Sequence, residues 1–277
     1  MDDDGPELVL AADGVTHVVR RGDTVRRPVR PFTATVQAFL AHLHARGFDA
    51  APLPLGYDEQ GREVLSFVAG DVPVAPLPAW AVTPEALAAL ARLVRRAHDA
   101  AQGWDPPAGA VWGDLPGGPT TRPAPTDGAP PGAPPEPVLV AHQDYCPGNV
   151  VFRDGMPVAL IDFDLARPTT RVADAVNALH WWVPLTGPVD RSPALADADA
   201  AERVRVFADA YGMTAEQRAL VVPRALWRAR RSTARMRAAA EVDPVFRRWW
   251  DEGVKDRGPR TERWLTAEAP RIAARLR

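Results

Sequence analysis

Apolar and polar residues alternate in short runs near the start of the chain. The segment 8–27 is strand-like, but Ala12-Asp13-Gly14 and Arg21-Gly22-Asp23, which are typical of turns, interrupt it. Alternation with a period of two places apolar side chains on one face of a β-strand. A further strand-like run, 63–70, ends at a glycine. These runs predict a β-hairpin and a later strand.

Longer segments have apolar residues three and four positions apart, which is the spacing of one face of an α-helix. The first begins at Thr33, which we expect to cap it, and ends before Gly47. The second begins at Thr83-Pro84-Glu85, where Thr can cap the helix and Pro suits its first turn. Four later segments are also predicted to be helical: 172–183, 200–211, 215–241 and 260–276.

Two short apolar runs, 138–140 and 158–161, have the pattern of buried strands. Each is followed by polar residues, which are His142, Asp144 and Asn149 after the first run and Asp162 and Asp164 after the second. Strands that end close together would bring these side chains to one place. The pattern therefore predicts a polar site at the strand ends.

The length of 277 residues suits two lobes around one cleft, and 46% hydrophobic residues can supply real cores. The segment 106–137 stands apart because it contains 11 of the 30 prolines. Such a composition buries too little apolar surface to offset the entropy of ordering. We expect an extended or mobile insertion on the surface of the larger lobe, with its first part pinned by Trp104, Val111 and Trp112.

Composition also excludes several classes of protein. A single cysteine, Cys146, rules out a disulfide framework, and it is expected to fill space in a loop. The N-terminus lacks the basic and apolar parts of a signal peptide, and no run is apolar enough to span a membrane. The net charge of −2 gives no indication of nucleic-acid binding. We expect a soluble, cytoplasmic protein that is a monomer or weak dimer.

The positive charge is concentrated near the C-terminus, where the segment 214–277 holds 16 Lys and Arg against 8 Asp and Glu. Four arginines recur at helical spacing: Arg224, Arg228, Arg231 and Arg235. Such a basic stripe is most often a solvated helix face. The alternative is a surface for an anionic substrate or partner.

The polar residues at the strand ends follow the pattern H-x-D-x-x-x-x-N and then hydrophobic-Asp-hydrophobic-Asp. Phosphoryl transfer requires a protein to orient an attacking hydroxyl and to hold metal against phosphate oxygens. Asp144 can orient the hydroxyl, and Asn149 with Asp162 can hold the metal. The spacing thus indicates a magnesium-dependent phosphotransferase.

This pattern resembles the aminoglycoside phosphotransferase and small-molecule kinase family, with D-F-D at 162–164 where protein kinases have D-F-G. The resemblance implies an α+β, bilobal protein-kinase-like fold. A small β-rich N-lobe, 1–69, would cover the nucleotide. A larger, mainly α-helical C-lobe, 70–277, would hold the catalytic loop and the substrate site.

The resemblance also implies individual roles. ATP or GTP and Mg²⁺ would be the cofactors, and backbone groups near Ser66, Phe67 and Val68 would face the adenine or guanine edge. His142 would orient the catalytic loop, and Asp174 would fasten it through backbone hydrogen bonds. Asp164 is open to three interpretations: a partner of the metal ligands, a neighbour of the metal, or a solvated loop carboxylate.

The chain departs from the family pattern in its N-terminal strands, because its only lysine is Lys255. Arg27, with Arg26 as its rival, is expected to replace the family's strand lysine. Val25 shares the strand face of Arg27 and would pack on the base. The following helix, 33–46, has no Glu or Asp to pair with that arginine, and Gln37 is the nearest polar candidate.

Two hypotheses therefore remain for activity: a functional kinase with a modified anchor, or a nucleotide-binding pseudokinase with little or no transfer activity. A third class, a metal-dependent hydrolase that uses His142, Asp144 and Asp162, lacks a second histidine cluster. Because the three oxygen-bearing residues of the motif are all present, we favour an active kinase.

The resemblance implies that the acceptor is a small hydroxylated molecule, either an antibiotic such as an aminoglycoside, whose phosphorylation confers antibiotic resistance, or a related metabolite. The alternative to a polycationic aminoglycoside is a neutral or anionic compound such as a sugar, a nucleoside or a macrolide. Carboxylates that could bind a polycation are Asp190, Asp197, Asp199 and Glu202. Trp181 and Trp182 could stack on a ring. Adjacent helical residues point in different directions, however, so one of the two is expected in the core.

Overall fold

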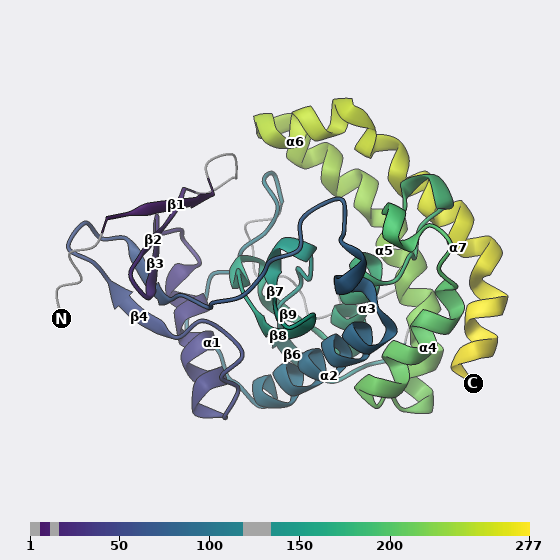
Figure 1. Ribbon diagram of the computed structural model, residues 1–277, viewed down its shortest axis with the longest axis horizontal. Coiled ribbons are helices and arrows are strands. Elements are labelled where there is room, and N and C mark those ends of the chain that lie inside the picture. The colour runs from purple at the N-terminus through teal and green to yellow at the C-terminus, as the bar shows by residue number, and fades with distance from the viewer. Residues whose placement is uncertain (1–5, 12–16, 119–133) are drawn as a thin grey trace.

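A computed structural model describes residues 6–11, 17–118 and 134–277. Figure 1 shows a small antiparallel sheet with one helix at the N-terminal end of the molecule and a mainly helical part at the other end. Short strands lie in the middle, between these two parts. The predicted α+β, bilobal arrangement is confirmed.

The N-terminal sheet has the strand order β1-β2-β3-β5-β4, and all its pairs are antiparallel. Its strands are β1 (Leu8–Ala11), β2 (Val18–Arg21), β3 (Thr24–Arg27), β4 (Pro54–Tyr57) and β5 (Glu63–Ser66). The predicted hairpin turn between β2 and β3 is present, with Gly22 at φ 58°. The first predicted turn, 12–14, lies outside the described residues.

Helix α1 (Thr33–Ala45) packs beside this sheet, and its buried side chains include Val36, Phe39 and Leu40. The expectation that Thr33 caps the helix is wrong by one residue, because Phe32 holds the cap position. The Thr33 hydroxyl instead accepts the backbone N–H of Arg30 at 2.9 Å. Local sequence marks a helix start well, but it does not decide which residue takes the non-helical dihedral angles.

The chain passes into the second part through a close backbone contact. Asp71 and Phe152 exchange two backbone hydrogen bonds, both of 2.8 Å. A Cβ atom on Gly70 would lie 2.4 Å from the carbonyl oxygen of Phe152. Glycine is therefore required at this approach.

The helices of the second part are α2 (Pro84–Ala101), α3 (Arg171–Trp182), α4 (Ala200–Tyr211), α5 (Ala215–Val242), α6 (Pro244–Trp249) and α7 (Lys255–Leu276). The predicted cap of α2 is confirmed, since Thr83 accepts the N–H of Ala86 at 3.1 Å. The last helix begins earlier than predicted, at Lys255. None of the helices within the described ranges is long and apolar enough to cross a membrane.

Two small antiparallel pairs lie at the centre. Strand β6 (Val138–Ala141) pairs with β9 (Arg167–Thr170), and β7 (Val150–Arg153) pairs with β8 (Met156–Leu160). The catalytic loop, which we define as residues 142–149, connects β6 to β7 and ends in a short 3₁₀ turn, Pro147–Asn149. The predicted run 138–140 forms β6 before this loop, and the run 158–161 overlaps β8, which pairs with β7 after the loop.

Part of the proline-rich insertion is packed rather than mobile. Residues 104–118, here called the strap, cross from α1 to α5. The ring of Trp104 lies 4.8 Å from that of Phe39, and Val111 N–H donates to Thr35 Oγ1 at 3.0 Å. At the far end, Asp114 contacts Arg235 at 2.6 Å. As expected, Trp104 and Trp112 hold this first part against the core, whereas Val111 is held through its backbone and its side chain is exposed. Residues 119–133 lie outside the described chain.

The strap approaches the catalytic region so closely that a side chain would not fit at Gly113. A Cβ atom there would lie 1.8 Å from the carbonyl oxygen of Asp164. We predict that Gly113→Ala lowers stability by about 1–3 kcal/mol, the usual cost of overpacking. Thermal unfolding measures this. The matched control is Gly187→Ala, whose nearest neighbour would lie at 3.9 Å. Equal melting temperatures of the two variants would contradict the packing of the strap.

Candidate active site

His142 fixes the start of the catalytic loop with both of its ring nitrogens. Its Nε2–H donates to the carbonyl oxygen of Ile161 at 2.9 Å, and its Nδ1 accepts the N–H of Asp144 at 3.2 Å. The ring also lies against Tyr145 and Phe163, at 5.1 and 4.4 Å between centroids. With both nitrogens occupied, His142 has no free atom for a metal or a proton transfer. This geometry argues against the hydrolase hypothesis.

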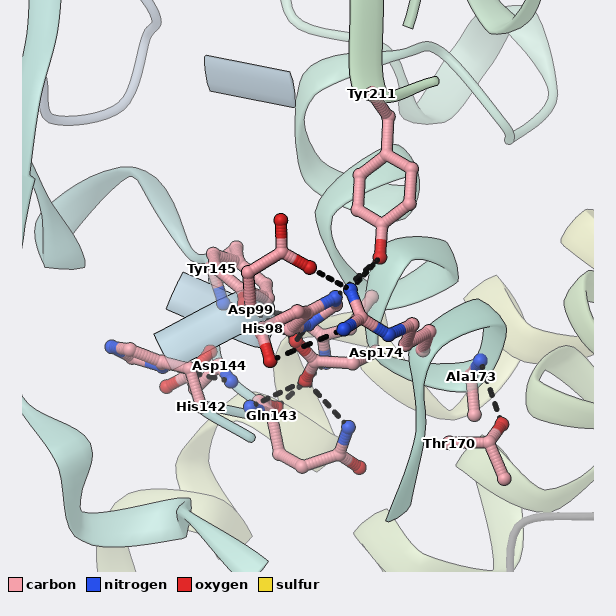
Figure 2. A network of polar contacts seen from close by, with 12 residues as sticks. His98, Asp99, His142, Gln143, Asp144, Tyr145, Thr170, Ala173, Asp174 and Tyr211 are labelled. Atoms are coloured by element: carbon pink, nitrogen blue, oxygen red, sulfur yellow. Dashed lines mark hydrogen bonds and ion pairs between the residues drawn. The ribbon is translucent and has the colours of Figure 1, made fainter. Parts of the chain in front are cut away.

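Asp174, in the first turn of α3, contacts several residues of the catalytic loop (Figure 2). It is fully buried and its Oδ1 accepts the backbone N–H of Gln143 at 2.8 Å. Its Oδ2 accepts the Tyr145 hydroxyl at 2.5 Å and faces His98 Nε2 at 2.7 Å. Burial alone would raise the pKa of Asp174, but the hydrogen bonds from His98 and Tyr145 hold it below its usual value. The carboxylate therefore remains charged and able to accept these bonds.

Two residues of this network had no recognisable signal in the sequence. His98 comes from the buried face of α2, and its Nδ1 lies 2.7 Å from the hydroxyl of Tyr211 on α4. Asn177, one turn after Asp174, accepts the N–H of Tyr145 at 3.0 Å and donates to the carbonyl of Gln143 at 2.8 Å. Asn177 is three residues after Asp174, so the two side chains share one face of α3, but this spacing alone does not predict a contact with the loop.

Asp144 lies in the middle of the loop, bonded to neighbours that define its orientation. Its Oδ2 accepts the side-chain amide of Asn149 at 3.0 Å, and its Oδ1 accepts the N–H of Cys146 at 3.3 Å. Burial raises the pKa of Asp144, and the charge of Asp162 acts in the same direction, while His142 and Arg228 oppose it. The structure therefore brings Asp144, Asn149 and Asp162 into one site.

Asp162 has an unusual backbone conformation, with φ 60° and ψ 71°. A non-glycine residue in this left-handed region is strained, and such strain is common at functional sites. Its side chain is half exposed, at 50%. Asp164, in the 3₁₀ turn that follows, is more enclosed. Burial, with the charge of Asp162 adding to it, raises the pKa of Asp164 to about 7.

Arg27 reaches from β3 into this cluster of carboxylates. Its guanidinium lies 3.2 Å from Asp162 Oδ1 and 2.7 Å from Asp164 Oδ1. Glu63 contacts its Nε at 2.5 Å. Burial disfavours the charge of Arg27, but Asp164, Glu63 and Asp162 outweigh it and raise its pKa. Arg26 extends elsewhere, toward Asp58 at 3.6 Å.

Glu63 takes the part that the sequence could not assign. It is fully buried on β5, directly opposite Arg27 in the strand register. Gln37, the expected nearest partner, donates instead to the carbonyl of Gly56 at 3.1 Å. The counter-charge of the arginine therefore comes from the neighbouring strand and not from helix α1.

The segment after β5 has few backbone groups left for a nucleotide base. The N–H of Ser66 donates to Leu53 at 2.9 Å, and that of Phe67 donates to Asp23 at 2.8 Å. Among the described residues, the N–H of Val68 has no such partner. Val25 lies opposite Leu65 on the adjacent strand and is two residues before Arg27 on β3. A base would thus find its free backbone donor at Val68.

The donor set suits a metal that is bound mainly through phosphate. Within the described ranges, no group of three or more His, Cys, Asp and Glu side chains could hold a metal by itself. Mg²⁺ is typically held by one or two carboxylates together with substrate phosphates and water. The amide of Asn149 and the half-exposed carboxylate of Asp162 fit that description.

The carboxylates expected to bind a polycation are mostly neutralised by arginines. Asp190 contacts Arg260 at 2.6 Å, Asp199 contacts Arg271 at 2.5 Å, and Glu202 contacts Arg205 at 2.5 Å. Asp197 is exposed. The described part of the chain therefore has no cluster of free carboxylates at these positions.

The two tryptophans and the cysteine have different environments. Trp182 is buried in the core and donates its indole N–H to the carbonyl of Tyr145 at 2.8 Å, whereas Trp181 is only partly buried. Burial, helped by Asp144 and Asp162, raises the pKa of Cys146. A thiol of raised pKa is a poor nucleophile, so Cys146 has no sign of reactivity.

The fold and this site together define a phosphotransferase of the protein-kinase-like class. The model of the Phosphotransferase enzyme family matches residues 8–220. The chain belongs to this family and is a phosphotransferase with a hydroxyl group as acceptor.

Similar proteins include the trifolitoxin immunity protein of Rhizobium leguminosarum bv. trifolii, which is 33% identical over 255 residues, with 86% of each chain covered. A choline/ethanolamine kinase family protein from Mesorhizobium loti has a TM-score of 0.63 at 18% identity, over 100% of this chain and 94% of that one. Amicoumacin kinase hAmiN, solved with AMP-PNP and Ca²⁺, has a TM-score of 0.63 at 12% identity, over 98% and 87%. At these identities the two structures show the shared fold.

Gln143 provides a test of how the loop is held. It has φ 63°, a conformation that favours glycine, while its side-chain amide donates to Asp174 Oδ1 at 2.7 Å. Gln143→Ala loses the hydrogen bond and keeps the strained backbone. Gln143→Gly loses the same bond, but glycine adopts this backbone conformation without strain. We predict that the Ala variant is the less stable of the two by about 1 kcal/mol. Thermal unfolding measures the difference, and a more stable Ala variant would refute this explanation.

Proposed function

We propose that the chain transfers the γ-phosphoryl group of ATP or GTP to a hydroxyl of a small molecule, with Asp144 acting on that hydroxyl. The observation that carries the proposal is the convergence of Asp144, Asn149 and Asp162 with Arg27, which extends from the N-terminal sheet. Phosphoryl transfer depends mainly on positioning and charge stabilisation, and these four side chains can supply both.

In this mechanism Asp144 accepts, or aligns, the proton of the attacking hydroxyl. The amide of Asn149 holds one carboxylate oxygen and leaves the other beside the loop backbone. A pKa raised by burial makes the Asp144 carboxylate a stronger base than that of an exposed aspartate. Asn149 and Asp162 would hold Mg²⁺, which when bound neutralises charge on the phosphate oxygens.

Arg27 is proposed as the phosphate-binding cation on β3, with Val25 and the backbone of Val68 beside the base. Its planar guanidinium can bind two phosphate oxygens at once. Glu63 fixes the Nε edge of the group and leaves the two terminal nitrogens directed at Asp162 and Asp164. A bound phosphate would share these nitrogens.

The acceptor is proposed to be an antibiotic or a related hydroxylated metabolite. The name of the similar immunity protein associates it with trifolitoxin, and amicoumacin kinase is named for amicoumacin. Fold alone does not fix the acceptor, because similar structures include kinases named for choline, ethanolamine and aminopropanol.

The alternative is a nucleotide-binding pseudokinase with little or no transfer. The absence of a lysine on β3 favours it. The measurement that separates the two is consumption of ATP and of GTP, with magnesium, in the presence of hydroxylated compounds. Consumption stimulated by an acceptor supports the transferase, and nucleotide binding without turnover supports the pseudokinase.

Asp144→Asn should reduce kcat by about 100- to 10,000-fold, because the variant cannot accept a proton. Nucleotide affinity should stay close to that of the natural chain. Asp162→Ala should abolish magnesium-dependent turnover. Asp154→Asn, in an exposed turn with φ 52°, is the control for an Asp-to-Asn change and should retain full activity. Full turnover in both site variants would refute the assigned roles.

Arg27→Ala should lower kcat/KM for the nucleotide by about 100-fold, through the loss of a cation that stabilises phosphate charge. Arg26→Ala removes the same charge from the adjacent residue, which faces Asp58, and should have little effect. Steady-state kinetics at varied nucleotide concentration measures both. A larger effect at Arg26 would show that the anchor has been assigned to the wrong arginine.

A further inference from the structure

The basic stripe on α5, defined by Arg224, Arg228, Arg231 and Arg235, does not face solvent as a whole. Arg224 is buried and is ion-paired with Glu136, just before β6. Arg235 is ion-paired at 2.6 Å with Asp114 of the strap, next to Gly113 and its contact with Asp164. Arg224 is thus fixed to the segment before β6, and Arg235 is fixed to the part of the strap that lies against Asp164. The helix between them packs beside the active site.

Arg228 lies between these two anchored positions and differs from them. It is partly buried, yet none of the described residues forms an ion pair or hydrogen bond with it. Burial lowers the pKa of Arg228 to about 10, and Arg235 acts in the same direction. Asp144 is the one carboxylate whose charge opposes that shift. Among the described residues, this partly buried guanidinium close to the proposed base therefore has no counter-ion.

The other groups around Arg228 add positive charge or none. His180, at the end of α3, has its pKa lowered by burial and by the charges of Arg228 and Arg257, so it stays neutral. Arg231 lies over the ring of Trp227, at 5.5 Å. Asp190, which follows α3 in the chain, is bound to Arg260 and Arg257. A polycationic acceptor would be repelled here, whereas an anionic one would be attracted.

We propose that Arg228 binds a negatively charged group of the acceptor, a carboxylate or a phosphate ester, while the hydroxyl of that acceptor lies at Asp144. This inference rests on the proposed function and specifies its substrate class. Arginine binds the oxygens of either group through two hydrogen bonds at once. The ligand would provide the counter-charge that the described residues do not supply to Arg228. It would also fix the distance between its anionic group and the reacting hydroxyl.

The test compares acceptors that share one hydroxylated skeleton but differ in charge. One series is glycerol, 3-amino-1,2-propanediol, glycerate and glycerol 3-phosphate, and the other is glucose, glucosamine, glucuronate and glucose 6-phosphate. Acceptor-stimulated ATP consumption and calorimetric binding in the presence of magnesium are measured for each compound. We expect the anionic members of at least one series to bind and to be used best. The carboxylate and phosphate arms show which of the two anionic groups is preferred.

The variants are Arg228→Ala, Arg228→Lys and the control Arg230→Ala. Arg230 is on the same helix but is exposed and pairs with Glu262 at 2.7 Å. Arg228→Ala should lower affinity and kcat/KM for the anionic compounds by about 10- to 100-fold, the effect of losing a charged hydrogen bond. It should leave nucleotide binding unchanged and should affect neutral compounds much less than anionic ones. Arg228→Lys should restore part of the preference, which separates loss of charge from misfolding.

Three results would overturn the inference. They are a preference for cationic or neutral members, an anionic preference that persists in Arg228→Ala, and failure of every anionic compound to bind. Turnover with a cationic acceptor would reject the anionic class and still support a phosphotransferase. Absence of nucleotide binding and of turnover with all acceptors would instead reject the proposed function itself.

Discussion

The shape of the catalytic loop depends on one buried carboxylate. Asp174 is fully buried and gathers donors from the backbone and side chain of Gln143, from Tyr145 and from His98. A buried charge is costly unless hydrogen bonds satisfy it, so the protein must keep these donors in place. Because His98 belongs to α2 and Asp174 to α3, packing of the helical part determines where Asp144 lies. Catalytic geometry and the stability of the C-terminal helices are therefore inseparable.

A second cluster of charge links the two ends of the molecule. Arg27 is surrounded by Glu63, Asp162 and Asp164, so one cation faces three carboxylates. Such a site has an excess of negative charge, which a bound cation relieves. In its proposed role in place of the family's lysine, Arg27 has a different local arrangement. Its counter-ion lies on the adjacent strand, where cross-strand pairing fixes the distance.

The sequence predicted elements whose signals are local. The hairpin of β2 and β3, the Thr83 cap of α2 and the strands around the catalytic loop follow from turn residues, capping residues and apolar runs. Contacts between distant segments were not predictable. Glu63 is 36 residues from Arg27, and only the strand register brings them together. The path of the strap across the molecule was not predictable either, because Gly113 and Asp114 contact segments that are distant in the sequence. The arginines of α5 looked like a solvated face because their partners, Glu136 and Asp114, come from far away in the chain.

The strap has a mechanical consequence for the cleft. It is hydrogen-bonded to Thr35 on α1 and ion-paired to Arg167 on β9 and to Arg235 on α5. Any hinge movement that separates the two lobes must break or carry along one of these attachments. Ligand entry on the nucleotide side and ligand entry beside α5 are then no longer independent events. Substitutions in α1 that loosen the strap would alter access for both ligands, although α1 itself touches neither Asp144 nor Arg228.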